Sequence, residues 1–111
     1  MFARLVQLVY SVSNPLFVRQ ASSSTGTPSS VVAAAADTAL LAANTARLGA
    51  TIYNDSTATL YLVAGSGAAS TTNYTIQIAP NGYYELPYNY TGAVRGIWTA
   101  ANGNARITEY T

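Results

Sequence analysis

Short segments in which apolar and polar residues alternate, separated by clusters of turn-forming residues, dominate the sequence from Ala50 onward. In the segment 74–78, a tyrosine and two isoleucines alternate with Thr75 and Gln77, which is typical of a half-buried strand. Asn, Gly, Pro and Ser separate such segments at intervals of about 8–12 residues, and this spacing favours an all-β protein. The predicted fold is an antiparallel β-sandwich or small barrel.

The predicted strands share this alternation and cover residues 50–54, 59–64, 74–78, 83–88, 93–99 and 105–110. We predict a tight turn at Pro80-Asn81-Gly82, with the glycine at positive φ, and a two-residue hairpin turn at Asn102-Gly103. Pro87 indicates an edge strand or a strand end. The expected core consists of apolar residues on these segments: Leu41, Ile52, Leu60, Leu62, Ile76, Ile78, Leu86, Val94, Trp98 and Ile107.

The segment 31–43 has two possible conformations. Its alanines and leucines have good helix propensity, but it has no polar face and is followed by a β-rich sequence. We therefore interpret Thr38–Ala43 as a strand, and a helix remains the alternative.

Residues 1–30 are expected to form an extended N-terminal arm and linker, and residues 31–111 the β-sandwich domain. Residues 21–30 are small and polar, as in flexible linkers, whereas 5–10 and 16–18 are apolar. A signal peptide is the less favoured interpretation of the N-terminus, and no stretch approaches the ~20 apolar residues of a membrane helix. The candidate interface residues are the apolar side chains of the arm and two tyrosines: Leu5, Val6, Leu8, Tyr10, Leu16, Phe17, Tyr83 and Tyr90.

The composition excludes several kinds of chemistry. The chain has no cysteine, histidine or lysine, so it has no thiol nucleophile, no imidazole base and no Schiff-base amine. We expect no catalytic residues, no cofactor and no metal, and hence no enzyme. The net charge is +1 and only 8% of residues are charged, compared with about 25% in an ordinary domain. So few charges argue against nucleic acid as a partner, and we expect much of the surface to be covered by partner proteins.

Four motifs have both a chemical and a structural interpretation. Glu85 and Glu109 could be a glycosidase pair, but two solvent-facing carboxylates on neighbouring strands, with Arg95 or Arg106 as candidate partners, are the favoured interpretation. Asp37 and Asp55 could bind Ca²⁺ only weakly, and Asp55 is interpreted more simply as part of an Asx turn. Asn-x-Ser/Thr patterns are attributed to turn chemistry rather than glycosylation. Several aromatic residues could stack on a sugar, although β-propensity explains them as well: Tyr83, Tyr84, Tyr88, Tyr90 and Trp98.

Arg47 lies in a predicted turn before Gly49. Its guanidinium could anchor that turn through backbone carbonyls or a carboxylate. An ion pair between subunits is the alternative, and the sequence leaves both open.

Three segments carry a resemblance to a known group of proteins: LAANTARLGATIYNDS at 41–56, GYYELP at 82–87 and GAVRGIW at 92–98. They resemble a β-domain of small virion structural proteins of tailed bacteriophages, which include head decoration (cement) proteins and neck or tail components. The resemblance covers residues 38–110 and implies a capsid decoration protein. Such a protein would be a homo-oligomer, with a trimer favoured, that binds the major capsid protein in virions assembled in the host cytoplasm. The alternatives are a neck or tail component, or a carbohydrate-binding module.

Overall fold

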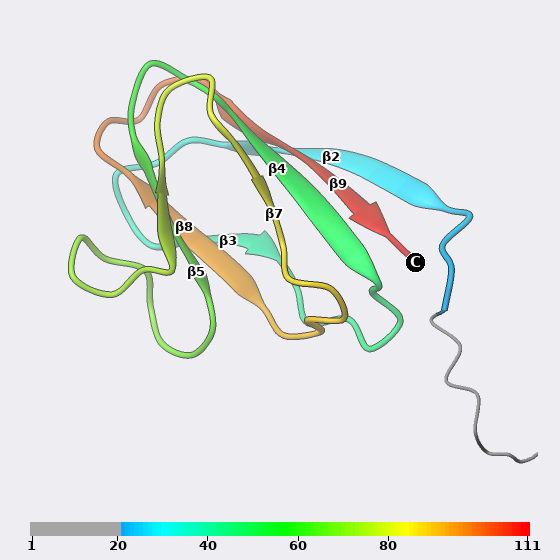
Figure 1. The fold of residues 1–111 in the computed structure, drawn as a ribbon. Coiled ribbons are helices and arrows are strands. Elements are labelled where there is room, and N and C mark those ends of the chain that lie inside the picture. The colour runs from blue at the N-terminus through cyan, green and yellow to red at the C-terminus, as the bar shows by residue number, and fades with distance from the viewer. Residues whose placement is uncertain (1–20) are drawn as a thin grey trace, which may run out of the picture.

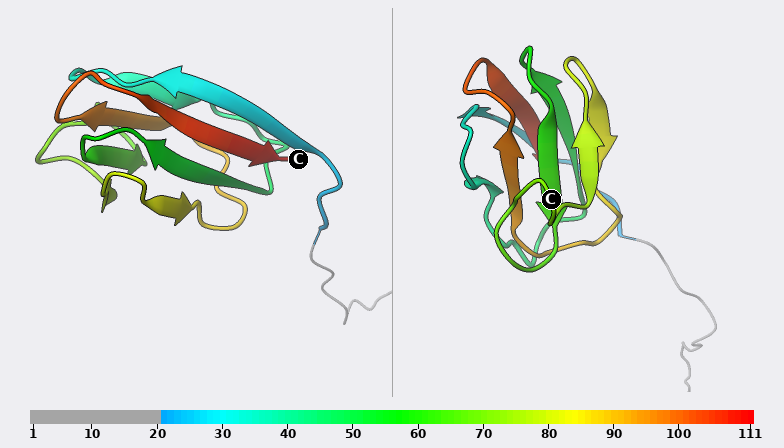
Figure 2. Two further views of the ribbon diagram at one scale, coloured as in Figure 1. Left: turned by 90° about the horizontal axis from the view of Figure 1, so that it is seen from above. Right: turned by 90° about the vertical axis from the view of Figure 1, so that its left-hand side faces the viewer.

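Two antiparallel sheets of four strands each face one another in the computed structural model, which describes residues 21–111 (Figure 1). Their strand orders are β2-β9-β4-β7 and β3-β8-β5-β6, and the two layers are separated in Figure 2. The predicted all-β sandwich is confirmed. The strands are β2 (Gly26–Val32), β3 (Thr38–Leu41), β4 (Gly49–Asp55), β5 (Leu60–Ala64), β6 (Ile76–Ile78), β7 (Tyr83–Glu85), β8 (Val94–Trp98) and β9 (Asn104–Tyr110).

The core lies between the sheets and is formed by alternate residues of each strand. Ile52 of β4 stands opposite Ile107 of β9, and both are buried against Trp98 and other core residues from the second sheet. The predicted core is confirmed except at Leu41 and Ile76, which are only half-buried.

The predicted strand at 38–43 is confirmed for residues 38–41, which form strand β3 and pair with β8, whereas residues 42 and 43 lie beyond its end. The helix is excluded. The β3–β8 register shifts between Ala39 and Leu41. Leu40 therefore takes the fully buried position that the sequence suggested for Leu41.

Strand β2 was not predicted, and the interpretation of residues 26–30 as linker is wrong. β2 pairs with β9 along its whole length, from Gly26 opposite Tyr110 to Val32 opposite Asn104. Its side chains are exposed on both faces apart from the half-buried Val31, so the strand has no alternation of apolar and polar residues to detect. Within residues 21–111 the first strand of the sandwich therefore begins at residue 26. Six interface candidates lie outside the described residues: Leu5, Val6, Leu8, Tyr10, Leu16 and Phe17.

Two predicted turns differ in detail from the structure. Asn102-Gly103 does not close a hairpin, because β8 and β9 belong to different sheets. Gly103 has φ of +78° and a Cβ there would lie 2.3 Å from the carbonyl oxygen of Asp55, so only glycine fits this crossing between the sheets. In the turn 80–82, the positive φ (62°) belongs to Asn81 rather than to Gly82. β7 is an edge strand that ends before Pro87, as predicted.

Candidate functional site

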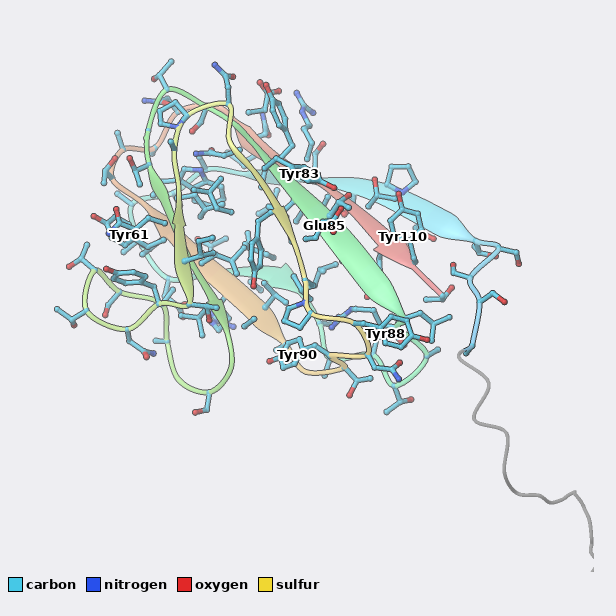
Figure 3. The ribbon with its side chains drawn as sticks, viewed as in Figure 1. Tyr61, Tyr83, Glu85, Tyr88, Tyr90 and Tyr110 are labelled. Carbon is cyan, nitrogen blue, oxygen red and sulfur yellow. The ribbon has the colours of Figure 1, made fainter. Side chains whose placement is uncertain are left out.

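Exposed tyrosines gather on the outer surface of the β2-β9-β4-β7 sheet. Tyr53 of β4 stands opposite Tyr83 of β7, and Gly49 of β4 stands opposite Tyr110 of β9. Residues opposite one another in antiparallel strands point to the same face, and the odd positions of β4 face away from the core residue Ile52. We call the surface formed by Tyr53, Tyr83, Tyr88 and Tyr110 the tyrosine face; the last three are labelled in Figure 3.

These four side chains are unusually exposed for aromatic residues. Tyr83 is 59% exposed, Tyr88 46%, and Tyr53 and Tyr110 38% each. The Tyr53 hydroxyl donates to Oδ1 of Asn81 at 3.0 Å. The rings thus offer apolar area together with hydroxyl groups, which is the combination that makes tyrosine frequent in protein interfaces.

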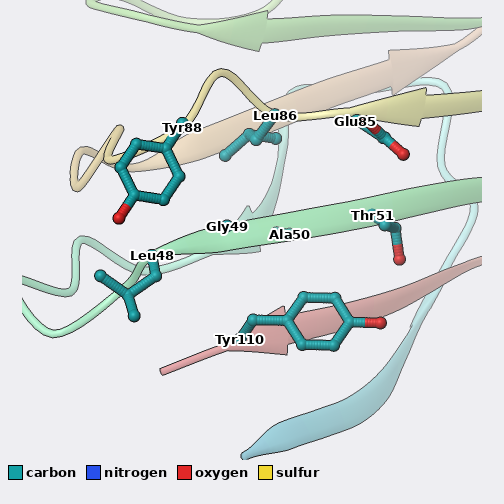
Figure 4. A pocket seen from close by; sticks show the side chains of 8 residues that line it. All are labelled: Leu48, Gly49, Ala50, Thr51, Glu85, Leu86, Tyr88 and Tyr110. Atoms are coloured by element: carbon teal, nitrogen blue, oxygen red, sulfur yellow. The ribbon is translucent and has the colours of Figure 1, made fainter. Parts of the chain in front are cut away.

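A groove of about 350 Å³ crosses one end of the tyrosine face. Tyr88 and Tyr110 lie on opposite sides of it, and Gly49 and Ala50 of β4 form the floor between them (Figure 4). A second groove of about 380 Å³ lies on the same sheet between β2 and β4, lined by residues that include Tyr53. Both grooves are on the outer surface of one sheet, so the side chains of a bound partner could fill them.

The tyrosine face carries little net charge. Arg106 of β9 is paired with Asp55 of β4, their Nε and Oδ2 atoms being 2.9 Å apart. Glu85 accepts a hydrogen bond of 2.7 Å from the Tyr83 hydroxyl, and this bond raises the pKa of Tyr83. Among residues 21–111, Glu85 is the carboxylate without an arginine partner. A partner for this face must therefore be bound mainly by shape, apolar contact and hydrogen bonds.

The two glutamates do not form a catalytic pair. Glu85 stands opposite Thr51, whereas Glu109 stands opposite Ala50, so they point to opposite faces of the sheet. The suggested pairing with Arg95 or Arg106 is wrong, because Glu109 pairs with Arg47. Paired carboxylates that could attack a sugar from two sides are therefore not assembled here.

Asp37 and Asp55 are each paired with an arginine instead of converging on one site. Asp37 receives bonds of 2.8 and 2.9 Å from Nε of Arg95, and its Oδ1 accepts from the Ala69 amide. Within residues 21–111 no three carboxylate, imidazole or thiol side chains come together as a metal site would require. The same range contains no helix able to cross a membrane.

The Asp37–Arg95 pair gives a pH-dependent contribution to stability. The hydrogen bond from Arg95 and then that from the Ala69 amide hold the pKa of Asp37 below its ordinary value. Since the folded pKa is the lower one, this contribution is complete above about pH 4–5, where Asp37 is ionised even in the unfolded chain, and is lost as the pH falls through the folded pKa.

We expect the melting temperature to fall below about pH 4, and to fall less steeply in Asp37→Asn than in the wild type. Thermal unfolding monitored by circular dichroism between about pH 2 and 6 measures this. Identical slopes for the two proteins would show that other carboxylates cause the acid sensitivity.

Arg47 is fully buried and anchors its turn by both of the means suggested for it. Its Nε donates to Glu109 at 2.8 Å, and its terminal nitrogens donate to three backbone carbonyls. The alternative of an ion pair between subunits is wrong, because no part of the side chain is exposed.

The aromatic cluster suggested by the sequence is divided between core and surface. Tyr83 and Tyr88 are exposed, but Trp98 is buried. Tyr84 and Tyr90 pack against the core, and the Tyr90 hydroxyl donates to the carbonyl of Ala93. Tyr90 is half-buried and contributes to core packing, whereas Tyr83 is exposed, and the interface role of both residues stays a prediction.

Tyr53 and Tyr110 were not among the predicted interface residues. Each lies in a predicted strand, two positions from another outward-facing residue, Thr51 and Thr108 respectively. The alternation therefore contained the signal, but only the strand pairing shows that both residues share a face with Tyr83.

Comparison of the chain with protein-family models, with curated proteins and with solved structures finds no match.

Proposed function

We propose that this chain is a virion structural protein of a tailed bacteriophage, and specifically a capsid decoration (cement) protein. The sequence resemblance supports this role through residues that hold the β-sandwich together, among them Arg47, Asn54 and Trp98. The observation that carries the proposal is the tyrosine face. This surface is aromatic and exposed, and its arginine, Arg106, is paired with Asp55. Such a surface is suited to a protein interface and attracts a charged small molecule only weakly.

The proposed mechanism is thermodynamic, and the protein is not an enzyme. A protein that binds the assembled shell but not its free subunits stabilises the shell by mass action. A specific contact of this kind buries about 1,200–2,000 Å² in total. The partners are the major capsid protein and further copies of this chain, with a trimer favoured, and not nucleic acid or a membrane. The protein would act in the virion, after assembly in the host cytoplasm.

Replacing two tyrosines of the tyrosine face tests this role. We expect Tyr83→Ser with Tyr110→Ser to weaken binding to empty capsid shells of the phage at least tenfold, about 1.4 kcal/mol, because tyrosines are frequent hot spots. The matched control is Tyr74→Ser, since Tyr74 is 40% exposed but lies next to β6 in the other sheet. Co-sedimentation with shells measures the affinity. Equal binding by all three proteins would contradict the proposal.

Deleting the N-terminal residues tests the predicted arm. We expect a chain without residues 1–20 to remain folded, because the eight strands that the structure describes lie between residues 26 and 110, but to lose binding to the shell. A chain without residues 1–30 should unfold or aggregate, because the deletion removes residues 26–30 of β2 and exposes β9 as a new edge. Circular dichroism and co-sedimentation distinguish these results. Full shell binding by the shorter deletion would show that the arm has no role in assembly.

A neck or tail component would use the same domain, and imaging of labelled protein on virions distinguishes these positions. A carbohydrate-binding module is the second candidate function, favoured by the groove between Tyr88 and Tyr110. Aromatic rings stack on the apolar faces of sugars, and Glu85 and Thr51 at the groove could accept or donate hydrogen bonds. A glycan array in which the wild type binds a defined sugar and Tyr88→Ala does not would support this function in place of shell binding.

A further inference from the structure

Strand β2 has a free edge that the described chain leaves uncovered. Among residues 21–111 it is the outermost strand of its sheet, and β9 is the one strand that it pairs with. Val32 is 73% exposed, and both faces of the strand are open to solvent apart from the half-buried Val31. Proteins usually protect such edges with lysine, an inward charge, a bulge or proline. The chain contains no lysine, and Pro28 is the single proline in β2.

The register shows which backbone groups of β2 point outward. In an antiparallel pair, residues alternate between those bonded to the partner strand and those that face away from it. Just beyond the two ends of β2, the Thr25 carbonyl accepts from the Thr111 amide, and the Ala33 amide donates to the Gly103 carbonyl. The odd residues therefore bond to β9, and the even residues direct their backbone groups to the free edge. Pro28 has no amide hydrogen, so the outward donors are the three other even residues: Gly26, Ser30 and Val32.

The path of the chain before β2 leads away from this edge. The Tyr88 hydroxyl donates to the carbonyl of Ala21 at 2.9 Å. Tyr88 follows β7, which is the opposite edge strand of the same sheet (Figure 3). Residues 21–25 thus carry the chain from the start of β2 towards Tyr88, away from the free edge of β2.

We propose that the free edge of β2 binds residues 6–12 of a second copy of this chain, as an added antiparallel or parallel strand. This segment, Val-Gln-Leu-Val-Tyr-Ser-Val, has the same length as β2 and is rich in β-branched and aromatic residues. An added strand would form hydrogen bonds with the outward backbone groups of β2. Its side chains would alternate between the two faces of the sheet and pack beside the exposed side chains of β2. The eight residues between Val12 and Ala21 allow these two positions to lie up to about 30 Å apart, which is enough to reach a neighbouring molecule.

The biological role of this strand exchange rests on the assembly function proposed above. If each copy binds the segment of the next copy, the contacts can close into a ring of any number of subunits. Strand exchange is therefore compatible with the favoured trimer. The contact consists of backbone hydrogen bonds and apolar side chains, so the oligomer should be insensitive to salt.

Amide hydrogen exchange in the purified full-length protein tests the pairing without any capsid. We expect the amides of Ser30 and Val32 to exchange at least tenfold more slowly than those of exposed loops, and to lose this protection when dilution dissociates the oligomer. Leu8→Pro should remove the protection, because proline interrupts the added strand. The control is Ser22→Pro, which places proline in the same N-terminal region outside the pairing segment. In every variant the Ser29 and Val31 amides should stay protected by β9.

A synthetic peptide of residues 1–20 provides the reverse test. We expect it to restore protection of Ser30 and Val32 in the Leu8→Pro protein. Protection that persists in Leu8→Pro would show that another surface covers the edge, and protection in a monomer by sedimentation would show that the chain's own segment does so. Rapid exchange of both amides at all concentrations would overturn the proposal. None of these results depends on shell binding, so failure here is distinguishable from failure of the decoration role.

Discussion

Replacing Arg47 by methionine should lower the free energy of unfolding by about 3–5 kcal/mol, the usual effect of removing one partner from a buried ion pair. The guanidinium joins three separate parts of the chain. Nε donates to Glu109 at 2.8 Å, one terminal nitrogen donates to the carbonyls of Tyr90 (3.1 Å) and Gly92 (2.7 Å), and the other donates to that of Ala42.

Methionine fills much of the same volume but leaves the Glu109 carboxylate and three carbonyl oxygens without these donors. Lysine in the same place should also destabilise the protein, because a single ammonium group cannot reproduce the fork of donors. Urea unfolding followed by circular dichroism measures the change.

The matched control is Arg106→Met. Arg106 also forms an ion pair with a carboxylate, and its Nε lies 2.9 Å from Oδ2 of Asp55, compared with 2.8 Å between Arg47 and Glu109. The Arg106 side chain, however, is 53% exposed. Exposed pairs contribute about 0–1 kcal/mol. Equal effects at the two arginines would show that burial of Arg47 does not determine its contribution.

Replacing Trp98 by alanine should destabilise the domain by about 3–5 kcal/mol, the usual cost of emptying a large aromatic site in a core. Trp98 is 1% exposed and ends β8 between the two sheets. Its Nε1 donates to Oδ1 of Asn54 at 3.1 Å. The cavity left by alanine would therefore be accompanied by the loss of a buried hydrogen bond.

Trp98→Phe separates these two contributions. Phenylalanine keeps an aromatic ring in the core but has no indole nitrogen, so we expect a loss of about 1–3 kcal/mol from the hydrogen bond and incomplete filling. Asn54 would keep its other bonds, including Nδ2 to the carbonyls of Ala58 and Ile78 at 2.8 and 2.9 Å. Thermal and urea unfolding measure both variants. A Trp98→Ala protein with unchanged stability and weakened shell binding would instead make Trp98 an interface residue.

Local patterns in the sequence were sufficient to predict most strands and most of the core. The alternation around Ile52 and Ile107 places apolar side chains on one face of each strand, and a strand with a polar and an apolar face is stable only with the apolar face covered. Trp98 follows the same alternation in β8, so its burial was predictable. The turn containing Arg47 was predictable too, together with the kinds of group that its guanidinium would bind.

Only the tertiary structure decided which strands pair and which surfaces they form. β2 has no apolar face, so its position depends on backbone hydrogen bonds to β9. The paired residues, such as Gly26 and Tyr110, are far apart in the sequence. Asn102-Gly103 has the sequence of a hairpin turn, yet the chain crosses there between sheets, because β9 is already paired with β2 and β4. Strand propensity and turn chemistry are local properties. Pairing depends instead on distant segments that compete for the same backbone groups, and it alone brings Tyr53, Tyr83 and Tyr110 onto one face.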